Sequence, residues 1–351
     1  MRTKDLSSQG IAGATVINAC ARIFSSLLKF LVIIVIAKDF GAGLTVDAYM
    51  VAKSVPFLFI MIGEATLVTS FLPIFLDFRV KQGENAAWLL ADSVFTFVLI
   101  VLAGMLVCVM VLAPGITMAL APGLPAETLA LGTSLLRMMS PVIVLTGICS
   151  MGACIFNSYR HFTIPAIASV LFPLGMVVSI VLLGDVLGVI AIPVGALVGM
   201  SAQTIVLLTA LTRGKRSFRL AFKFRSPGFL ETMRSIFPRL VAFIVNRLNM
   251  MVDRVFASAL GGGYISALSY ADRIVQISVI LFTNSLIRAA MPVLCKLNSV
   301  GDGEGFRNMF GKMSGMLFFS PYRRPSYSFF LEDRLSTSYS KGAPLMPKQV
   351  Q

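Results

Sequence analysis

The chain has 351 residues, of which 57% are hydrophobic and only 13% are charged. An ordinary soluble domain is about half apolar and about a quarter charged, so this composition excludes a water-soluble globular enzyme as the default class. The formal net charge of +14 would suggest nucleic-acid binding in a polar sequence, but here Lys and Arg stand between long apolar runs. We therefore interpret them as topology signals of a membrane protein, with no nucleic-acid partner.

Cysteine and histidine offer little support for metal chemistry or catalysis. The only histidine is His161, beside Arg160 in a short polar connection, and no pair of cysteines has CxxC spacing. A membrane-embedded transferase or phosphatase would need clustered Asp or His residues at the bilayer surface, which the sequence lacks. We expect a protein that is not an enzyme and binds no metal. The cysteines all lie inside apolar stretches and are expected to be packing residues: Cys20, Cys108, Cys149, Cys154 and Cys295.

Long apolar runs predict a polytopic all-α bundle. The hydrocarbon core of a bilayer needs about 20 apolar residues per helix. A weaker further span is expected near Phe306. The eight clear spans cover residues 11–37, 47–76, 86–113, 128–156, 162–183, 186–212, 229–260 and 264–295.

The connections between these spans alternate between basic and nearly uncharged. Arg79 and Lys81 follow the second span, Arg160 follows the fourth, and the basic segment 213–225 follows the sixth. The positive-inside rule therefore predicts a multi-pass protein of the cytoplasmic (inner) membrane with its N-terminus in the cytoplasm. We interpret segment 213–225 as a topology signal; the alternative is that it binds anionic lipid head groups.

An internal repeat relates the first two spans to the seventh and eighth. An offset of 219 residues aligns Ala52–Phe75 with Ala271–Leu294, and an offset of 225 aligns Arg22 with Arg247. Six helices separate the copies, so both copies cross the membrane in the same direction. This arrangement is typical of transporters built from two parallel lobes.

The repeat and the composition together predict the domain organisation. One complete six-helix lobe is followed by the beginning of a second lobe and by a tail rich in Pro, Tyr, Ser, Arg and Lys. We expect this tail to be disordered or not native to the fold, and the second lobe to be incomplete. The predicted parts are a first lobe at 1–212, a basic cytoplasmic linker at 213–228, an incomplete second lobe at 229–319 and the tail at 320–351.

Ionisable residues inside the spans predict a polar cleft. Each costs about 2.5 to 3.5 kcal/mol on insertion scales, so such residues are expected to face a cavity or a partner. Arg22 and Lys29 are seven residues apart and share a helix face, a spacing that Arg247 and Arg254 repeat. A cleft lined by such cations suits a pyrophosphate head group. The further candidates for this cleft are Lys53, Glu64 and Arg273, with Asp253 as a candidate cation site.

Several motifs resemble the MviN/MurJ family of lipid II flippases, in the multidrug, oligosaccharidyl-lipid and polysaccharide exporter superfamily. They are Phe40–Gly43 followed by Asp47–Tyr49, Glu64 leading to Phe71–Ile74, and Tyr270–Arg273 after a glycine-rich turn. The resemblance covers about residues 10–319. It implies a V-shaped pair of bundles that moves an undecaprenyl-pyrophosphate-linked murein precursor across the inner membrane by alternating access.

The resemblance also implies roles for individual residues. Arg22, Asp47, Glu64 and Arg273 carry over as residues of the substrate cleft, and Asp253 carries over to a cation site. We expect no organic cofactor, with Na⁺ or H⁺ as a coupling cation. Two alternatives stay open: a flippase for another polyprenyl-linked glycan, and an inactive truncated fragment, because the family's second bundle is longer than the part predicted here.

Overall fold

The computed structural model describes residues 8–213, 217–275, 305, 309 and 311. All regular structure in these residues is helical, which confirms the predicted all-α class. Residues 264–275 form a further helical stretch. The elements are α1 (Ser8–Phe40), α2 (Leu44–Ala52), α3 (Ser54–Thr66), the π-helix η1 (Leu67–Phe71), α4 (Leu72–Lys81), α5 (Glu84–Leu120), α6 (Ala126–Met139), α7 (Val142–Ser158), α8 (Thr163–Leu187), the 3₁₀-helix η2 (Gly188–Ile190), α9 (Ala191–Arg213) and α10 (Pro227–Ala259).

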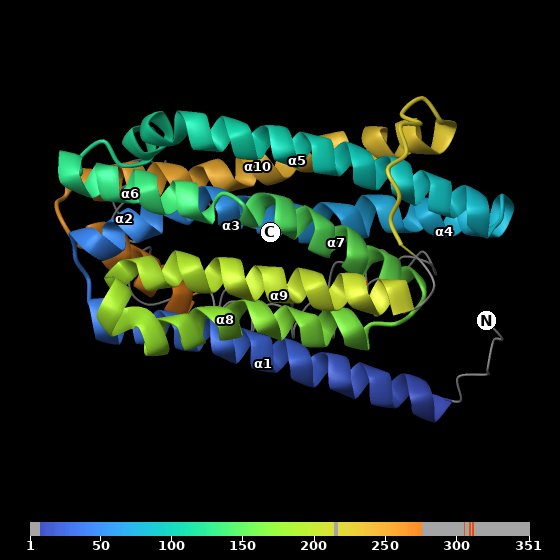
Figure 1. The fold of residues 1–351 in the computed structure, drawn as a ribbon, viewed down its shortest axis with the longest axis horizontal. Helices are drawn as coiled ribbons and strands as arrows, with labels where there is room; N and C mark the ends of the chain where they lie inside the picture. The colour runs from blue at the N-terminus through green and yellow to red at the C-terminus, as the bar shows by residue number, and fades with distance from the viewer. Residues whose placement is uncertain (1–7, 214–216, 276–304, 306–308, 310, 312–351) are drawn as a thin grey trace, which may run out of the picture. The chain divides into compact units, whose positions relative to one another are not determined.

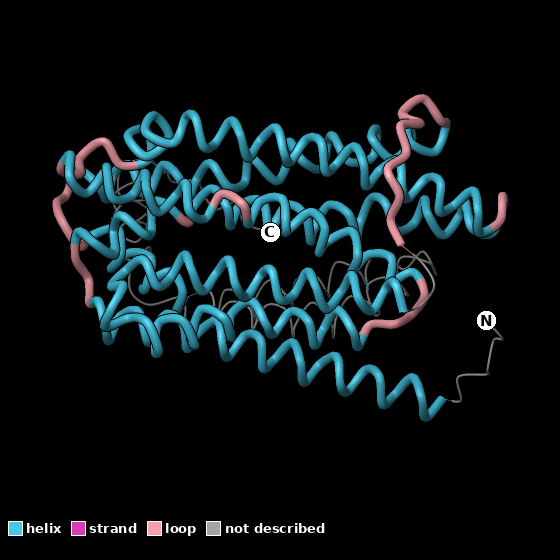
Figure 2. Tube along the Cα trace, in the orientation of Figure 1, coloured by secondary structure: helices cyan, strands magenta, loops and turns pink. Residues whose placement is uncertain are grey.

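The chain divides into two compact units, Met1–Tyr270 and Ala271–Gln351. The first unit contains every element from α1 to α10, and its helices run roughly along one direction (Figures 1 and 2). α8 packs against α9 and α1, α5 packs against α6 and α7, and α10 packs against α3, η1 and α5. The predicted seventh span therefore belongs to the same unit as the first six.

Four helical stretches of the described residues are long and apolar enough to cross a membrane: Leu44–Gly63, Glu84–Leu120, Ala126–Ser158 and Thr163–Arg213. The last of these contains α8 and α9, which were predicted as two separate spans. The predicted spans at 11–37 and 229–260 correspond to α1 and α10. The remainder of the predicted span 264–295, and the tail 320–351, lie outside the described residues.

Two predicted spans are interrupted rather than continuous. The span predicted at 47–76 has a turn at Lys53 between α2 and α3, and the π-helix η1 follows α3. The span predicted at 128–156 breaks at Ser140 and Pro141. Hydropathy does not reveal such breaks because the residues on both sides remain apolar. Single π turns often occur at functional sites, and η1 lies where α10 contacts this span.

Glycines allow α8 and α9 to approach closely. A Cβ atom added at Gly175 would lie 2.6 Å from the Cα of Gly199, a distance that no side chain tolerates. Ser179 also donates a hydrogen bond of 2.7 Å to the carbonyl of Ala191 across the η2 turn. Small residues of this kind are the usual means of tight helix packing in a bilayer.

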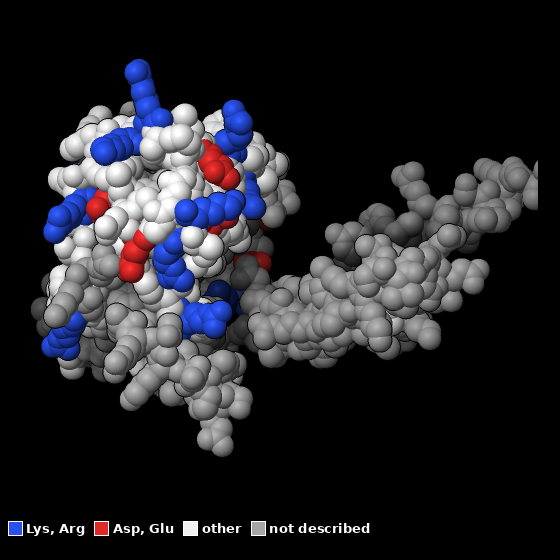
Figure 3. Space-filling view, turned by 90° about the vertical axis from the view of Figure 1, so that its right-hand side faces the viewer, with Lys and Arg blue, Asp and Glu red and all other residues white. Residues whose placement is uncertain are grey.

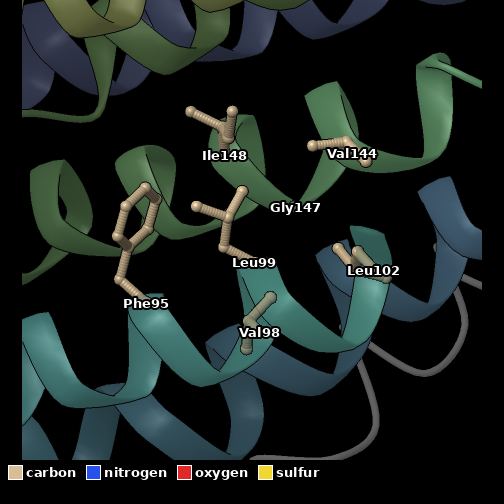
Figure 4. Close-up of a pocket in the computed structure, with 7 residues that line it drawn as sticks. All are labelled: Phe95, Val98, Leu99, Leu102, Val144, Gly147 and Ile148. Carbon is tan, nitrogen blue, oxygen red and sulfur yellow. The ribbon is translucent and has the colours of Figure 1, made fainter. Parts of the chain in front are cut away.

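Apolar side chains fill the contact between α5 and α7. Phe95, Leu99 and Leu102 of α5 face Ile148 and its neighbours on α7 (Figure 4). A Cβ at Gly147 would lie only 2.2 Å from Leu102 Cδ1, so the glycine makes room for that leucine. This interface positions α5 for the polar contacts described below.

An arginine compensates a proline inside α5. Pro114 has no N–H, so the carbonyl of Met110, four residues earlier, loses its usual helical donor. Arg137 of α6 supplies the replacement, because its Nε donates a hydrogen bond of 3.1 Å to the Met110 oxygen. In a bilayer an unpaired carbonyl costs several kcal/mol, so this contact explains a cation in the predicted fourth span.

A double-mutant cycle tests this compensation. Arg137→Gln should lower the melting temperature of the detergent-purified protein, because the Met110 carbonyl loses its donor at a cost of about 1 to 3 kcal/mol. In the Pro114→Ala background the restored N–H can reach that carbonyl, so the same change should cost about 1 kcal/mol less. Equal effects of Arg137→Gln in both backgrounds would contradict the explanation.

Candidate functional site

A polar seam runs along the contact between the predicted first lobe and α10. On one side are α2, α3 and η1, and on the other are α10 and the segment 261–270. All of these residues belong to the first compact unit. The seam contains three groups of contacts, which we call the loop joint, the middle cluster and the π-turn contact.

The loop joint is built on Asp47, which is fully buried at the start of α2. Its Oδ2 accepts a hydrogen bond of 2.5 Å from the Gly263 backbone N–H, and its Oδ1 accepts one of 2.7 Å from the Ser266 N–H. These amides lie at the beginning of the helical stretch 264–275, where N–H groups have no partner within the helix. Asp47 therefore caps a helix that lies more than two hundred residues away in sequence, where a carboxylate also suits the helix dipole.

Two glycine-rich turns face each other in this joint. Gly263 has a φ of +89°, and a Cβ there would lie 3.0 Å from the Ala42 carbonyl oxygen. Tyr270 donates a hydrogen bond of 3.0 Å from its hydroxyl to the Gly41 carbonyl. Ser266 follows Asp47 by 219 residues, the same offset as the predicted repeat. The joint therefore connects positions that the repeat makes equivalent.

The middle cluster lies at the turn between α2 and α3. Arg254 of α10 donates a hydrogen bond from Nη1 to the Ser54 hydroxyl, and that hydroxyl donates a hydrogen bond of 2.9 Å to the Met50 carbonyl. The Lys53 ammonium lies 5.2 Å from the centroid of the Tyr49 ring. The structure thus places two of the predicted cleft cations, Lys53 and Arg254, at the same turn, and both are half-buried.

The π-turn contact occupies the other end of the seam. Arg239 of α10 donates a hydrogen bond of 2.7 Å from Nη1 to the Ser70 hydroxyl. Ser70 in turn donates a hydrogen bond of 3.4 Å to the Ser235 carbonyl. Ser70 is buried within η1. The Cys154 thiol contacts the carbonyl of Leu67, in the same π turn, at 3.7 Å. Arg239, whose position also suggests a snorkelling interfacial residue, here contacts the first lobe directly.

The other predicted cleft residues are placed only in part. The side chains of Arg22, Glu64 and Arg247 lie outside the described residues, although their backbones lie on α1, α3 and α10. Lys29 is exposed on α1, and Asp253 is exposed on α10. Arg273 belongs to the second compact unit. Their roles in a substrate cleft or cation site stay predictions, and within the described ranges no cluster of His, Cys, Asp and Glu has the arrangement of a metal site.

Sequence reasoning missed the hydroxyl partners of the arginines. Ser54 and Ser70 sit beside the two interruptions of the span predicted at 47–76, and nothing in hydropathy marks them. The placement of Asp47 also differs from the expectation of a cleft residue, because both of its oxygens accept from backbone amides. An acid beside a glycine turn carries no sequence signal that separates a remote helix cap from a ligand-binding group.

The family model for the lipid II flippase MurJ matches residues 36–319, most of the chain. The chain belongs to the MurJ family. The lipid II flippase MurJ of Burkholderia cenocepacia is 28% identical over 283 residues, which cover 77% of this chain and 54% of that protein. A probable lipid II flippase MurJ of Buchnera aphidicola is 25% identical over 279 residues, covering 78% and 55%. The chain thus spans about half the length of these MurJ relatives.

A solved MurJ structure supports the fold. The chain matches a lipid II flippase MurJ in an inward closed conformation with a TM-score of 0.69 and 22% sequence identity. The match covers 82% of this chain and 60% of that structure. At this identity the likeness establishes the helical fold, whereas the family model establishes membership.

The loop joint generates a stability prediction. Asp47→Ala leaves two buried N–H groups without acceptors, at about 1 to 3 kcal/mol each, so we expect a loss of about 2 to 4 kcal/mol. Hydrogen–deuterium exchange should show faster exchange of the amides at 263–266. Asp39→Ala, which removes an exposed carboxylate at the end of α1, is the matched control and should leave both readouts unchanged. Unchanged exchange in Asp47→Ala would contradict the capping role.

Proposed function

We propose that this chain takes part in moving lipid II, the undecaprenyl-pyrophosphate-linked murein precursor, across the bacterial cytoplasmic membrane for peptidoglycan synthesis. It acts as a transporter by alternating access and catalyses no covalent reaction. Membership of the MurJ family carries the proposal, and relatives named lipid II flippase supply the substrate.

The seam supports alternating access physically. An alternating transporter needs contacts that close one end of the substrate path and that can exchange for others when the opposite end closes. The loop joint and the π-turn contact lie at opposite ends of the seam, and each consists of a few hydrogen bonds between predicted lobes. Such contacts are strong enough to bias one state and few enough to be broken.

The proposed substrate path rests on the cations that the sequence predicts, of which Lys53 and Arg254 lie in the seam. We propose that Lys53 and Arg254, with Arg22, Lys29, Arg247 and Arg273, receive the pyrophosphate, and that Glu64 balances their charge. Asp253 is the proposed ligand of a coupling cation, Na⁺ or H⁺. The end of the bundle that carries Arg79, Lys81 and Arg213 faces the cytoplasm in this proposal, in agreement with the positive-inside rule.

Complementation tests the substrate. The chain is expressed in a bacterium depleted of its own lipid II flippase, both alone and joined to the helices that the Burkholderia relative carries beyond the matched region. We expect the joined protein to restore growth and lipid II exposure, while the chain alone shows whether those helices are needed. A joined protein that reaches the membrane without rescue, where the relative rescues, would overturn the proposal.

Cross-linking tests alternating access. A Cβ at Gly262 would lie 2.9 Å from the Leu44 side chain, so the pair Leu44→Cys and Gly262→Cys should form a disulfide across the loop joint. Oxidation should stop lipid II exposure in the complementing protein, because the joint can no longer open, and a reductant should restore it. The two variants that carry only one of these introduced cysteines, oxidised in parallel, should stay active. Full activity of the cross-linked pair would exclude opening at this joint.

A further inference from the structure

The connection between α9 and α10 is fastened to the side of α5. We call residues 217–226 the strap. The backbone N–H of Arg219 in the strap donates a hydrogen bond of 3.0 Å to Asp92 Oδ1, and the backbone N–H of Ala221 donates one of 2.9 Å to the Thr96 hydroxyl. The Phe218 ring stacks on Phe95, with centroids 4.3 Å apart and planes 8° from parallel. Two side chains of α5 thus act as acceptors for a segment that has no regular secondary structure.

A cavity of about 520 Å³ lies between the strap and the first turns of α5. A chain of hydrogen bonds holds the α5 wall of the cavity in place. Trp88 Nε1 donates a hydrogen bond of 3.0 Å to the Tyr159 hydroxyl, and this hydroxyl donates one of 2.9 Å to Glu84 Oε1. The cavity is therefore a shaped site. The lining residues that matter here are Asn85, Trp88, Asp92, Ser217, Arg219 and Leu220.

The cavity lies near the end of the bundle that carries the first turns of α5. Asp92 is eight residues from the start of α5, about 12 Å along the helix. The strap crosses α5 near the level where α9 ends and α8 begins, and the turn between α4 and α5 projects beyond it (Figure 1). Lys and Arg side chains gather on the described part of this end (Figure 3). Trp, Lys and Arg mark the interface of a membrane protein, so a head group has access to this cavity.

The walls carry opposite charges that form no direct ion pair with each other. Asp92 is 9% exposed, and only its Oδ1 has a hydrogen-bond partner within the described part of the chain. The Arg219 side chain is exposed, and no ion pair joins it to Asp92, although both residues are described. A ligand that carries a cation and an anion within one small head group can pair with Asp92 and Arg219 at the same time.

We propose that this cavity binds the head group of a phospholipid with a primary ammonium, such as phosphatidylethanolamine. Its ammonium donates to Asp92, and its phosphate accepts from Arg219, with Asn85 and Ser217 as further donors. Phosphatidylcholine has no N–H to donate, and phosphatidylglycerol has only neutral hydroxyl donors, so neither gives Asp92 a charge-assisted donor. The exposed Leu220 side chain lies beside the acyl chains. This site requires only that α5 spans a bilayer and does not rest on the proposed transport function.

The protein reports this binding itself, because Trp88 is its only tryptophan and lines the cavity. The full chain is placed in phosphatidylcholine nanodiscs that contain a small fraction of lipid with brominated acyl chains, which quench nearby tryptophan. We expect brominated phosphatidylethanolamine to quench Trp88 with an apparent affinity about tenfold above that of brominated phosphatidylcholine, equivalent to one charge-assisted contact.

Matched variants separate the charge from the position of the strap. Asp92→Asn keeps an oxygen that accepts from the Arg219 N–H but removes the carboxylate, so the tenfold preference should fall to about one. Thr96→Val removes the other fastening without changing the charge and should keep the preference. Arg219→Gln should weaken the quenching by both lipids.

Three results would overturn the proposal. The first is equal quenching by both lipids in the unmodified chain, and the second is an Asp92→Asn variant that keeps the preference. The third is a Thr96→Val variant that loses it as completely as Asp92→Asn, which would make the effect one of strap position. Soluble phosphoethanolamine is added as a competitor: weak competition supports a lipid ligand, and full displacement at low concentration identifies a free ligand instead.

Discussion

Within a bilayer no water is available to pair with backbone N–H and C=O groups, and the rest of this structure depends on that constraint. At three irregular places in the chain, a polar side chain from another element pairs with a backbone group. Arg137 pairs with the carbonyl that Pro114 leaves free, Asp47 caps a distant helix, and Asp92 holds the strap. These three polar residues therefore pair with backbone groups at irregular places in an apolar chain.

Of these contacts, that of Asp47 joins parts of the chain that separate in the proposed alternating access. Helices that pack through apolar side chains and glycines, such as α8 with α9, have many small contacts and move together. The seam between the predicted lobes is different, because Asp47, Ser54 and Ser70 each connect the lobes through one or two hydrogen bonds. A structure of this kind has rigid groups of helices connected by a few exchangeable polar contacts.

Sequence patterns predicted the helical class and the positions of most spans, because length and hydropathy are properties of each segment alone. They predicted continuous helices at 47–76 and 128–156, where the structure has breaks at Lys53, η1 and Pro141. They also grouped the intramembrane charges as one cleft. The described residues bring Lys53 and Arg254 together, and they place Asp47 on backbone amides.

By itself, the sequence determined that this protein crosses a membrane repeatedly and that it resembles the MurJ family. It also determined that the connections at the two ends of the helical bundle differ in charge. These conclusions follow from composition, spacing and local motifs, which need no knowledge of contacts. Only the tertiary structure decided the partners of each polar group. Asp47 and Ser266 are 219 residues apart, and Asp92 and Arg219 are 127 apart, so no local pattern encodes either contact. They arise because helix packing brings a side-chain acceptor to an unpaired backbone donor.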